Sequence, residues 1–177
     1  MKRAILAVVF CASLTSCASL APPPPRQHTL TSTFNAGEVA WFNSEGTGSI
    51  SGQAFFQTRG GQPRTCAGLE IALYPHSAYA NERLMALYGS IDSGFIPAFA
   101  ARVQFSPDDP AYQQTRKTAV CDAQGNFNFT DLPAGKYFLI AAVMWTIPGQ
   151  EYMPQGGALL KSVALANGKS ERVILTH

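Results

Sequence analysis

The feature that most limits the fold is a run of nine consecutive apolar or aromatic residues at positions 137–145 (YFLIAAVMW). Side chains of a β-strand point alternately to its two faces, so a run without polar residues indicates a strand that is buried on both faces. Residues 132–135 (LPAG) end one residue before the run, and proline and glycine are typical of turns. We therefore predict a central strand of a β-sheet at residues 137–145.

Other segments show the shorter patterns of strands with one buried face. In residues 69–75 (LEIALYP), for example, apolar side chains occupy every second position until proline ends the pattern. Besides the central strand, the predicted strands are residues 49–57, 69–74, 115–121, 126–129, 159–165 and 171–176. We expect the last two to form a hairpin around Asn167 and Gly168, because Asn-Gly is typical of two-residue hairpin turns.

Residues 77–89 depart from this β-type pattern. The segment starts with Ser77, ends with Gly89 and has apolar residues at helical spacing between them. Serine is a preferred N-cap and glycine a preferred C-terminal residue of helices, so we predict one short inserted helix. The following residues, 90–112, contain three prolines and are predicted to form a long loop or an irregular strand. Long loops in small domains often have a function.

The N-terminal residues follow the pattern of an exported protein. Lys2 and Arg3 precede an apolar run at residues 4–12, which is roughly half as long as the ~20 residues that a membrane-spanning helix needs. Residues 14–17 (LTSC) resemble the lipobox of bacterial lipoproteins, in which cleavage precedes a cysteine that takes a diacylglycerol. We therefore predict a lipoprotein signal peptide at residues 1–16.

The same resemblance implies that Cys17 carries the lipid and attaches the protein to a membrane of the cell envelope. An ordinary signal peptide, cut between Ala12 and Ala18, is the alternative. In lipoproteins of the enterobacterial type, an aspartate after the lipidated cysteine retains the protein at the inner membrane. Ala18 stands at that position, so the resemblance implies the outer membrane, with the protein facing the periplasm.

The expected organisation is a signal peptide at 1–16, a lipidated cysteine with a Pro-rich tether at 17–36, and a β-sandwich domain at 37–177. Residues 76–112 are an insertion in that domain. Removal of the first 16 of 177 residues leaves 161, enough for one domain. Two of the 13 basic residues lie in the signal, so 11 remain and match the 11 acidic residues. Such a balance gives no electrostatic argument for nucleic acid as a partner.

Two further cysteines, Cys66 and Cys121, lie in the predicted domain. In an oxidising compartment an even pair of cysteines is typical of a disulfide. Two unpaired buried thiols are the alternative. A metal site is disfavoured, because no His or other Cys lies near either residue in the sequence.

Residues 122–137 contain D-x-x-G-x-F-x-F followed by L-P-x-G-x-Y, which resembles the same stretch of carboxypeptidase regulatory-like domains. Residues 52–55 (GQAF) and 67–75 (AGLEIALYP) are similar to the opening strands of that family. The resemblance covers residues 49–75 and 115–176. It implies a mainly β protein, a seven-stranded Greek-key sandwich of prealbumin-like type with one short inserted helix. It implies no function, because the matching residues are turn and core residues.

The motifs of enzymes on similar sandwiches are absent from the sequence. The three histidines, His28, His76 and His177, do not form the H-x-H pair of intradiol dioxygenases. Neither G-x-S-x-G nor H-E-x-x-H occurs. Asp122 and Asn126 lie in a segment that lacks the bidentate Glu of a Ca²⁺ loop, and a polar β-turn explains them. We therefore expect no catalytic residue, metal or cofactor.

Aromatic residues concentrated around the insertion are the candidate binding surface for a glycan or a protein of the envelope. They are Tyr79, Tyr88, Phe95, Phe99, Phe105 and Tyr112. The alternative is that they cover an open end of the sandwich. Trp41, with Val39 and Phe42, is expected to dock the end of the tether. The expected function is a lipid-anchored, non-catalytic module of the cell envelope for partner binding or assembly. The alternatives are a polysaccharide-binding module and, less favoured, an enzyme on a prealbumin-like sandwich.

Overall fold

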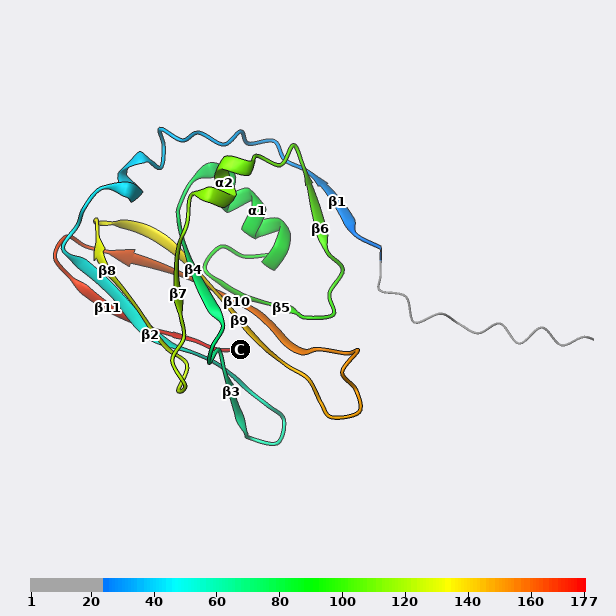
Figure 1. Cartoon of the computed structure of the whole chain (residues 1–177). Helices are drawn as coiled ribbons and strands as arrows, with labels where there is room; N and C mark the ends of the chain where they lie inside the picture. Colours follow the sequence, from blue (N-terminus) through cyan, green and yellow to red (C-terminus); the bar gives the residue numbers. More distant parts are fainter. Residues whose placement is uncertain (1–23) are drawn as a thin grey trace, which may run out of the picture.

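The computed structural model describes residues 24–177, and its two larger sheets face each other across a common core (Figure 1). The larger sheet has five strands in the order β5-β10-β9-β4-β7. Their bounds are Ser93–Pro97 for β5, Gln155–Leu165 for β10, Gly135–Trp145 for β9, Glu70–Pro75 for β4 and Lys117–Val120 for β7. The apolar run 137–145 thus lies in the middle strand of the larger sheet, as predicted.

The smaller sheet is built around β2 (Gly48–Gln57), which pairs in parallel with β11 (Ser170–Leu175). Two further strands pair antiparallel with successive parts of β2, namely β8 (Asn126–Leu132) and β3 (Pro63–Thr65). The inward-facing side chains of both sheets form the main core, which includes Ile50, Leu139 and Leu159. Burial of such side chains stabilises the fold by roughly 1.5–3 kcal/mol each.

The pairing of β11 corrects one prediction. We expected the last two strands to form a hairpin around Asn167 and Gly168, but β10 and β11 belong to different sheets. The residues between them carry the chain across the sandwich, and the Lys169 N–H donates to the Ala166 carbonyl within this turn. Leu165 of β10 and Val173 of β11 therefore reach the same core from opposite sheets. Burial of both strands on the core outweighed the local preference of Asn-Gly for a hairpin.

A third layer covers part of the outer face of the larger sheet (Figure 1). It consists of α1 (Ala78–Tyr88), α2 (Pro110–Gln114) and a two-stranded sheet in which β1 (Arg26–Thr29) pairs in parallel with β6 (Val103–Ser106). Helix α1 forms as predicted. The Ser77 hydroxyl accepts a hydrogen bond from the Ala80 N–H at 3.0 Å, and Gly89 follows the helix with a φ of 70°. Neither helix of residues 24–177 has the length and hydropathy that crossing a bilayer requires.

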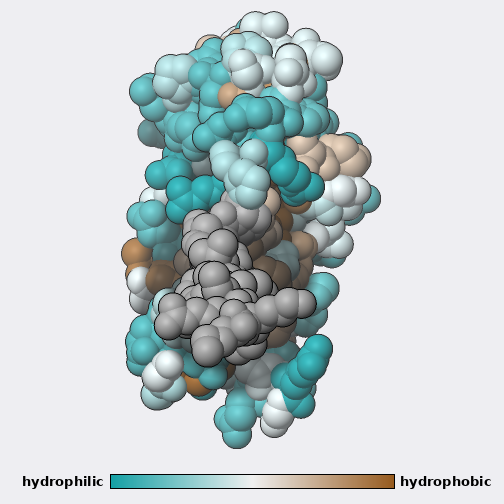
Figure 2. All heavy atoms as spheres, turned by 90° about the vertical axis from the view of Figure 1, so that its right-hand side faces the viewer, coloured by the Kyte–Doolittle hydropathy of each residue, from teal (hydrophilic) through white to brown (hydrophobic). Residues whose placement is uncertain are grey.

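The third layer has its own apolar core against the sheet. This second core contains Leu30, Tyr74, Tyr79, Ala80, Leu84, Tyr112, Phe138 and Leu160. The side of the molecule that shows the N-terminal end of the described chain is mostly hydrophilic in its upper part (Figure 2). The insertion 76–112 is therefore a structural layer on the sheet, and β5 within it forms one edge of the larger sheet.

Part of the expected tether is packed on the domain. Residues 26–29 form β1, Leu30 is buried, and the Glu82 carboxylate accepts hydrogen bonds from the Thr31 and Ser32 backbone N–H groups, both at 2.7 Å. The prediction that the tether extends to residue 36 is therefore wrong for this segment. The segment is polar, but a neighbouring strand and a helix carboxylate satisfy its backbone groups. The signal peptide and Cys17 lie outside the described residues.

The disulfide prediction is confirmed. Cys66 and Cys121 are bonded, with their Cα atoms 5.7 Å apart. Cys66 follows β3 of the smaller sheet and precedes β4 of the larger one, whereas Cys121 lies between β7 and β8. The bond therefore joins two points at which the chain passes between the sheets.

The described residues contain eleven strands, four more than the seven predicted. All seven predicted strands are present, and the additional ones are β1, β3, β5 and β6. Trp41 was predicted to dock the end of the tether, and it packs against the domain. It follows the start of a short 3-10 helix, Ala40–Asn43, and its ring packs at 5.2 Å from the ring of Tyr137. A Cβ atom on Gly135 would lie 2.3 Å from the Trp41 ring, so only glycine leaves room for this contact.

Candidate ligand-binding site

The six aromatic residues predicted as a binding surface do not form one. Tyr79 and Tyr112 are only 1% and 6% exposed and belong to the second core. Tyr88 and Phe105 are partly buried against that core, whereas Phe95 packs on the main core. Phe99 is 68% exposed, apart from the others in the connection between β5 and β6. Most of these aromatic residues are close in sequence because they help to pack the third layer on the outer face of the larger sheet. They form neither a binding surface nor a cover over an open end of the sandwich.

The buried aromatic rings surround a charged side chain that the sequence did not single out. Arg83 of α1 is 6% exposed, and its guanidinium lies 4.0 Å from the ring centre of Phe105 and 4.9 Å from that of Tyr112. It also forms an ion pair with Asp108. The Tyr79 hydroxyl accepts a hydrogen bond from the Asp109 N–H at 2.9 Å. These contacts join α1 to the start of α2, so the cluster is structural.

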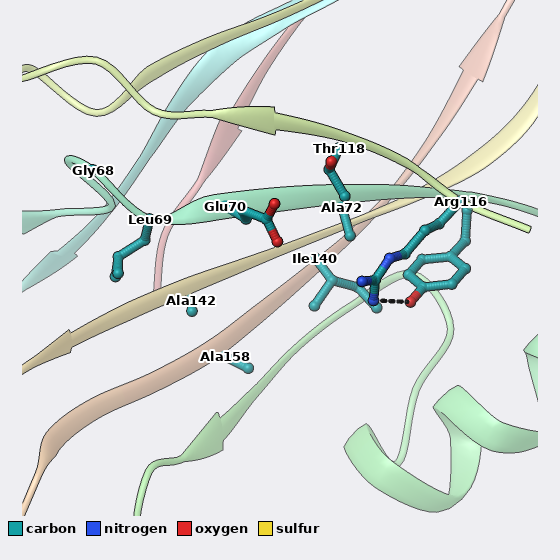
Figure 3. Close-up of a pocket in the computed structure, with 10 residues that line it drawn as sticks. Gly68, Leu69, Glu70, Ala72, Arg116, Thr118, Ile140, Ala142 and Ala158 are labelled. Carbon is teal, nitrogen blue, oxygen red and sulfur yellow. Dashed lines mark hydrogen bonds between the residues drawn. The ribbon is translucent and has the colours of Figure 1, made fainter. Parts of the chain in front are cut away.

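The outer face of the larger sheet has a hollow beside the third layer, which we call the trough (Figure 3). Its volume is about 540 Å³, within the range of ligand sites. Its lining residues are Gly68, Leu69, Glu70, Ala72, Tyr74, Arg116, Thr118, Ile140, Ala142 and Ala158. They come from four adjacent strands and the residues beside them.

The trough is hollow because small side chains meet across these strands. Ala72 of β4 lies opposite Thr118 of β7 and Ile140 of β9. In the next row Ala142 of β9 lies opposite Ala158 of β10. Side chains at such positions share one face of the sheet. Because the side chain of alanine is only a methyl group, it fills little of the space above the backbone. The pleated surface is therefore open to solvent where larger side chains would fill it.

Polar side chains stand at the rim of the trough. Figure 3 shows Glu70 and Arg116 reaching over the sheet, with Ile140 between them. The Arg116 guanidinium donates a hydrogen bond to the Tyr74 hydroxyl at 3.5 Å, which raises the pKa of Arg116 and keeps it charged. The Tyr74 ring is itself stacked on Tyr112, with ring centres 5.2 Å apart. The second core thus fixes one wall of the trough.

The side chains that line the trough can form hydrogen bonds with a ligand. A guanidinium supplies several donors, a carboxylate only acceptors, and hydroxyls supply both. Within residues 24–177 no group of three or more His, Cys, Asp or Glu side chains is arranged to hold a metal. Asp122 accepts hydrogen bonds from the Asn126 side-chain amide at 2.9 Å and from the Asn126 and Gln124 backbone N–H groups at 2.8 and 2.9 Å, which lower its pKa. It therefore caps a polar turn, as the sequence indicated.

Glu70 and Arg116 were not among the functional residues predicted from the sequence. A signal for Glu70 was present, because it is the outward-facing polar position of the alternating segment 69–75. The floor of the trough at Ala72, Ala142 and Ala158 depends on the register of three strands. No local sequence pattern indicates that these alanines lie side by side.

Comparison with known proteins gives a likeness of fold. No family model matches the chain, and no curated protein matches it. The crystal structure of a candidate carbohydrate-binding protein from Pseudomonas aeruginosa is similar, with a TM-score of 0.67. The two sequences are 24% identical, and the match covers 81% of this chain and 97% of that chain. At this identity the likeness establishes a shared fold.

Proposed function

We propose that the protein is a non-catalytic carbohydrate-binding module that recognises a polysaccharide in the trough. The observation that carries this proposal is the trough itself, in which Glu70, Thr118 and Arg116 surround a floor of small apolar side chains. The candidate carbohydrate-binding protein of similar fold supports the same class of ligand. This function was the alternative expected from the sequence, and the trough replaces the predicted aromatic surface as its site.

The chemistry of a sugar matches that of the trough. Each sugar ring has hydroxyls that both donate and accept hydrogen bonds around an apolar C–H framework. Arg116 offers donors, Glu70 offers acceptors, and Thr118 offers a hydroxyl. The low floor at Ala142 and Ala158 lets a ring approach the sheet surface closely. Because the trough lies open on the sheet, it suits an internal segment of a polysaccharide better than a small molecule that must be enclosed.

We further propose that this module is attached to the cell envelope by a lipid on Cys17, at the outer membrane facing the periplasm. Residues 14–17 (LTSC) and Ala18 support this proposal. Growth with labelled fatty acid tests it. The wild-type protein should incorporate the label and Cys17→Ser should not, and a labelled variant would contradict the anchor. We also propose that the sandwich is of the prealbumin-like, carboxypeptidase regulatory-like type, supported by the turn motifs in residues 122–137.

Binding to a panel of soluble polysaccharides, measured by affinity electrophoresis and then calorimetry, tests the ligand class. Arg116→Ala and Glu70→Ala should each weaken binding about 10-fold or more, because a hydrogen bond to a charged group contributes about 1.5–3 kcal/mol. Arg172→Ala, which removes an exposed arginine from β11, is the matched control and should bind as the wild type does. Equal binding by all three variants would exclude the trough as the site.

A second pair of variants tests the shape of the trough without removing charge. Ala142→Leu raises the floor and should abolish binding while the thermal midpoint of unfolding stays close to that of the wild type. Ala164→Leu adds the same bulk at an exposed position near the other end of the sheet and should have no effect. If no polysaccharide binds and a single envelope protein co-purifies instead, with the same dependence on Ala142, the partner-binding function is favoured.

A further inference from the structure

The β9–β10 connection and the end of β9 expose a cluster of large apolar side chains. We call Met144, Ile147, Tyr152 and Met153 the apolar tip; among the described residues they are half of the large hydrophobic side chains that are exposed. Tyr152 is the most exposed of them, at 74%. Isolated apolar residues on a surface are ordinary, but a cluster marks a contact surface.

Two backbone hydrogen bonds place the N-terminal end of the described chain on the same side as the apolar tip. The Ala98 N–H donates to the Gly156 carbonyl at 2.8 Å, which holds the β5–β6 connection beside the start of β10. The Arg26 N–H donates to the Arg102 carbonyl at 2.7 Å, which holds the start of β1 beside the same connection. Figure 1 shows these segments on its right-hand side.

The side chains around the apolar tip fit a membrane interface. Phe99, in the β5–β6 connection, is exposed, and Trp145 at the base of the tip lies 5.9 Å from the Arg64 guanidinium. Arg26 and Arg102 are exposed as well. Aromatic and apolar side chains with neighbouring arginines are typical of surfaces that contact the headgroup region of anionic bilayers. The acidic residue of the connection, Glu151, accepts a hydrogen bond from the Gly149 N–H at 2.8 Å.

The length of the chain before β1 limits where a bilayer can lie. Cys17 and Arg26 are nine residues apart, a separation that a fully extended chain spans by at most about 32 Å. A lipid on Cys17 therefore keeps Arg26, and with it the side of the apolar tip, close to the membrane surface. A tether reaching residue 36 would have removed this constraint, but residues 26–34 are packed on the domain.

We propose that the apolar tip inserts into the interface of the bilayer that carries the protein's own lipid. This inference rests on the proposed lipid at Cys17. The two acyl chains of a diacylglycerol hold the chain to the bilayer at one point, so the tip would be a second contact and would fix the orientation of the domain. The tip and the trough share no residue, so the two proposals can be tested separately.

The experiment uses the full lipidated chain, reconstituted in phosphatidylcholine–phosphatidylglycerol vesicles with brominated acyl chains, which quench tryptophan fluorescence on contact. The background variant is Trp145→Phe, which leaves Trp41 at the far end of β9, about 33 Å away at the spacing of a strand. Adding Tyr152→Trp places a reporter on the tip. Adding Ile174→Trp instead places one at an exposed apolar position of β11, as the matched control.

We expect the Tyr152→Trp signal to be reduced at least about twofold by brominated vesicles, because interfacial side chains reach about 5–10 Å into the acyl boundary. The Ile174→Trp and Trp41 signals should be unchanged. Protein that floats with the vesicles but shows no difference between the two reporters would overturn insertion of the tip. Protein that does not float would overturn the anchor and this inference with it. Polysaccharide binding would stand in both cases, since it is measured in solution with the trough variants.

Discussion

Arg83 is buried where an apolar residue would be usual on a helix face. A charged group costs free energy to bury unless hydrogen bonds, an ion pair or aromatic faces offset the lost hydration. Here the ring faces of Phe105 and Tyr112 and the carboxylate of Asp108 all contact the guanidinium. The flat, delocalised cation is what permits stacking, and lysine lacks it.

Replacement of Arg83 should therefore be strongly destabilising. Arg83→Ala should lower the free energy of unfolding by about 2–5 kcal/mol, measured by urea denaturation, because it empties the space between the rings and removes their contact with the cation. Arg83→Lys should recover only part of the loss. Arg172→Ala, at an exposed position, should stay within about 0.5 kcal/mol of the wild type. A loss below about 1 kcal/mol for Arg83→Ala would show that the cluster is not structural.

Glu82 makes the docking of the N-terminal segment depend on pH. Hydrogen bonds from Ser32 and Thr31 lower the pKa of Glu82 from 4.5 to about 2. Because the pKa is lower in the folded state, the carboxylate stabilises the docked segment above pH 4.5, and this stabilisation is lost as the pH falls towards 2. The backbone amide resonances of Thr31 and Ser32 should titrate over this range, and Glu82→Gln should remove the titration. Unchanged amide resonances between pH 5 and pH 2 would contradict the role of Glu82.

At the scale of elements, the insertion 76–112 keeps apolar side chains on the outer face of the larger sheet away from water. Tyr74, Phe138 and Leu160 face outward from the larger sheet and are buried only because the third layer covers them. Replacement of residues 77–112 by a short Gly/Ser turn would expose these side chains and remove β5 from the sheet edge. The shortened protein should lose cooperative thermal unfolding and expose apolar surface, as measured by calorimetry and dye binding. A folded, disulfide-bonded product would show that the insertion is dispensable for stability.

Local patterns predicted the elements well, and non-local contacts explain what they missed. Ser77 and Gly89 marked the ends of α1 because caps act within one turn of a helix. The apolar run of β9 identified the middle strand, because burial on both faces leaves a signal in consecutive residues. In contrast, β1 pairs with β6 almost 80 residues later, and its polar sequence has no strand pattern. The trough was missed for the same reason, since Ala142 and Ala158 become neighbours only through pairing.

At the scale of the whole molecule, the disulfide holds the two sheets in register at one end of the sandwich. The bonded cysteines are 55 residues apart, and closing a loop of this size stabilises the folded state by about 4 kcal/mol in the chain-entropy model. The double variant Cys66→Ser, Cys121→Ser should therefore unfold at lower urea concentration, with a loss of about 2–5 kcal/mol. Reduction of the wild type should produce a similar shift. An unchanged midpoint in both cases would show that the disulfide does not stabilise the folded state.

The parallel pairing of β11 with β2 also determines when the sandwich can be completed. The register joins Ser170 to Ser49 and Leu175 to Ala54, so the two strands are separated by about 120 residues of chain. Pairing over such a distance slows folding, because the entropy of closing the loop is lost before contacts form. A chain that crosses a membrane N-terminus first cannot close its smaller sheet until residues 170–175 have followed. If the protein is exported, as proposed, the smaller sheet therefore closes only after the whole chain has crossed the membrane.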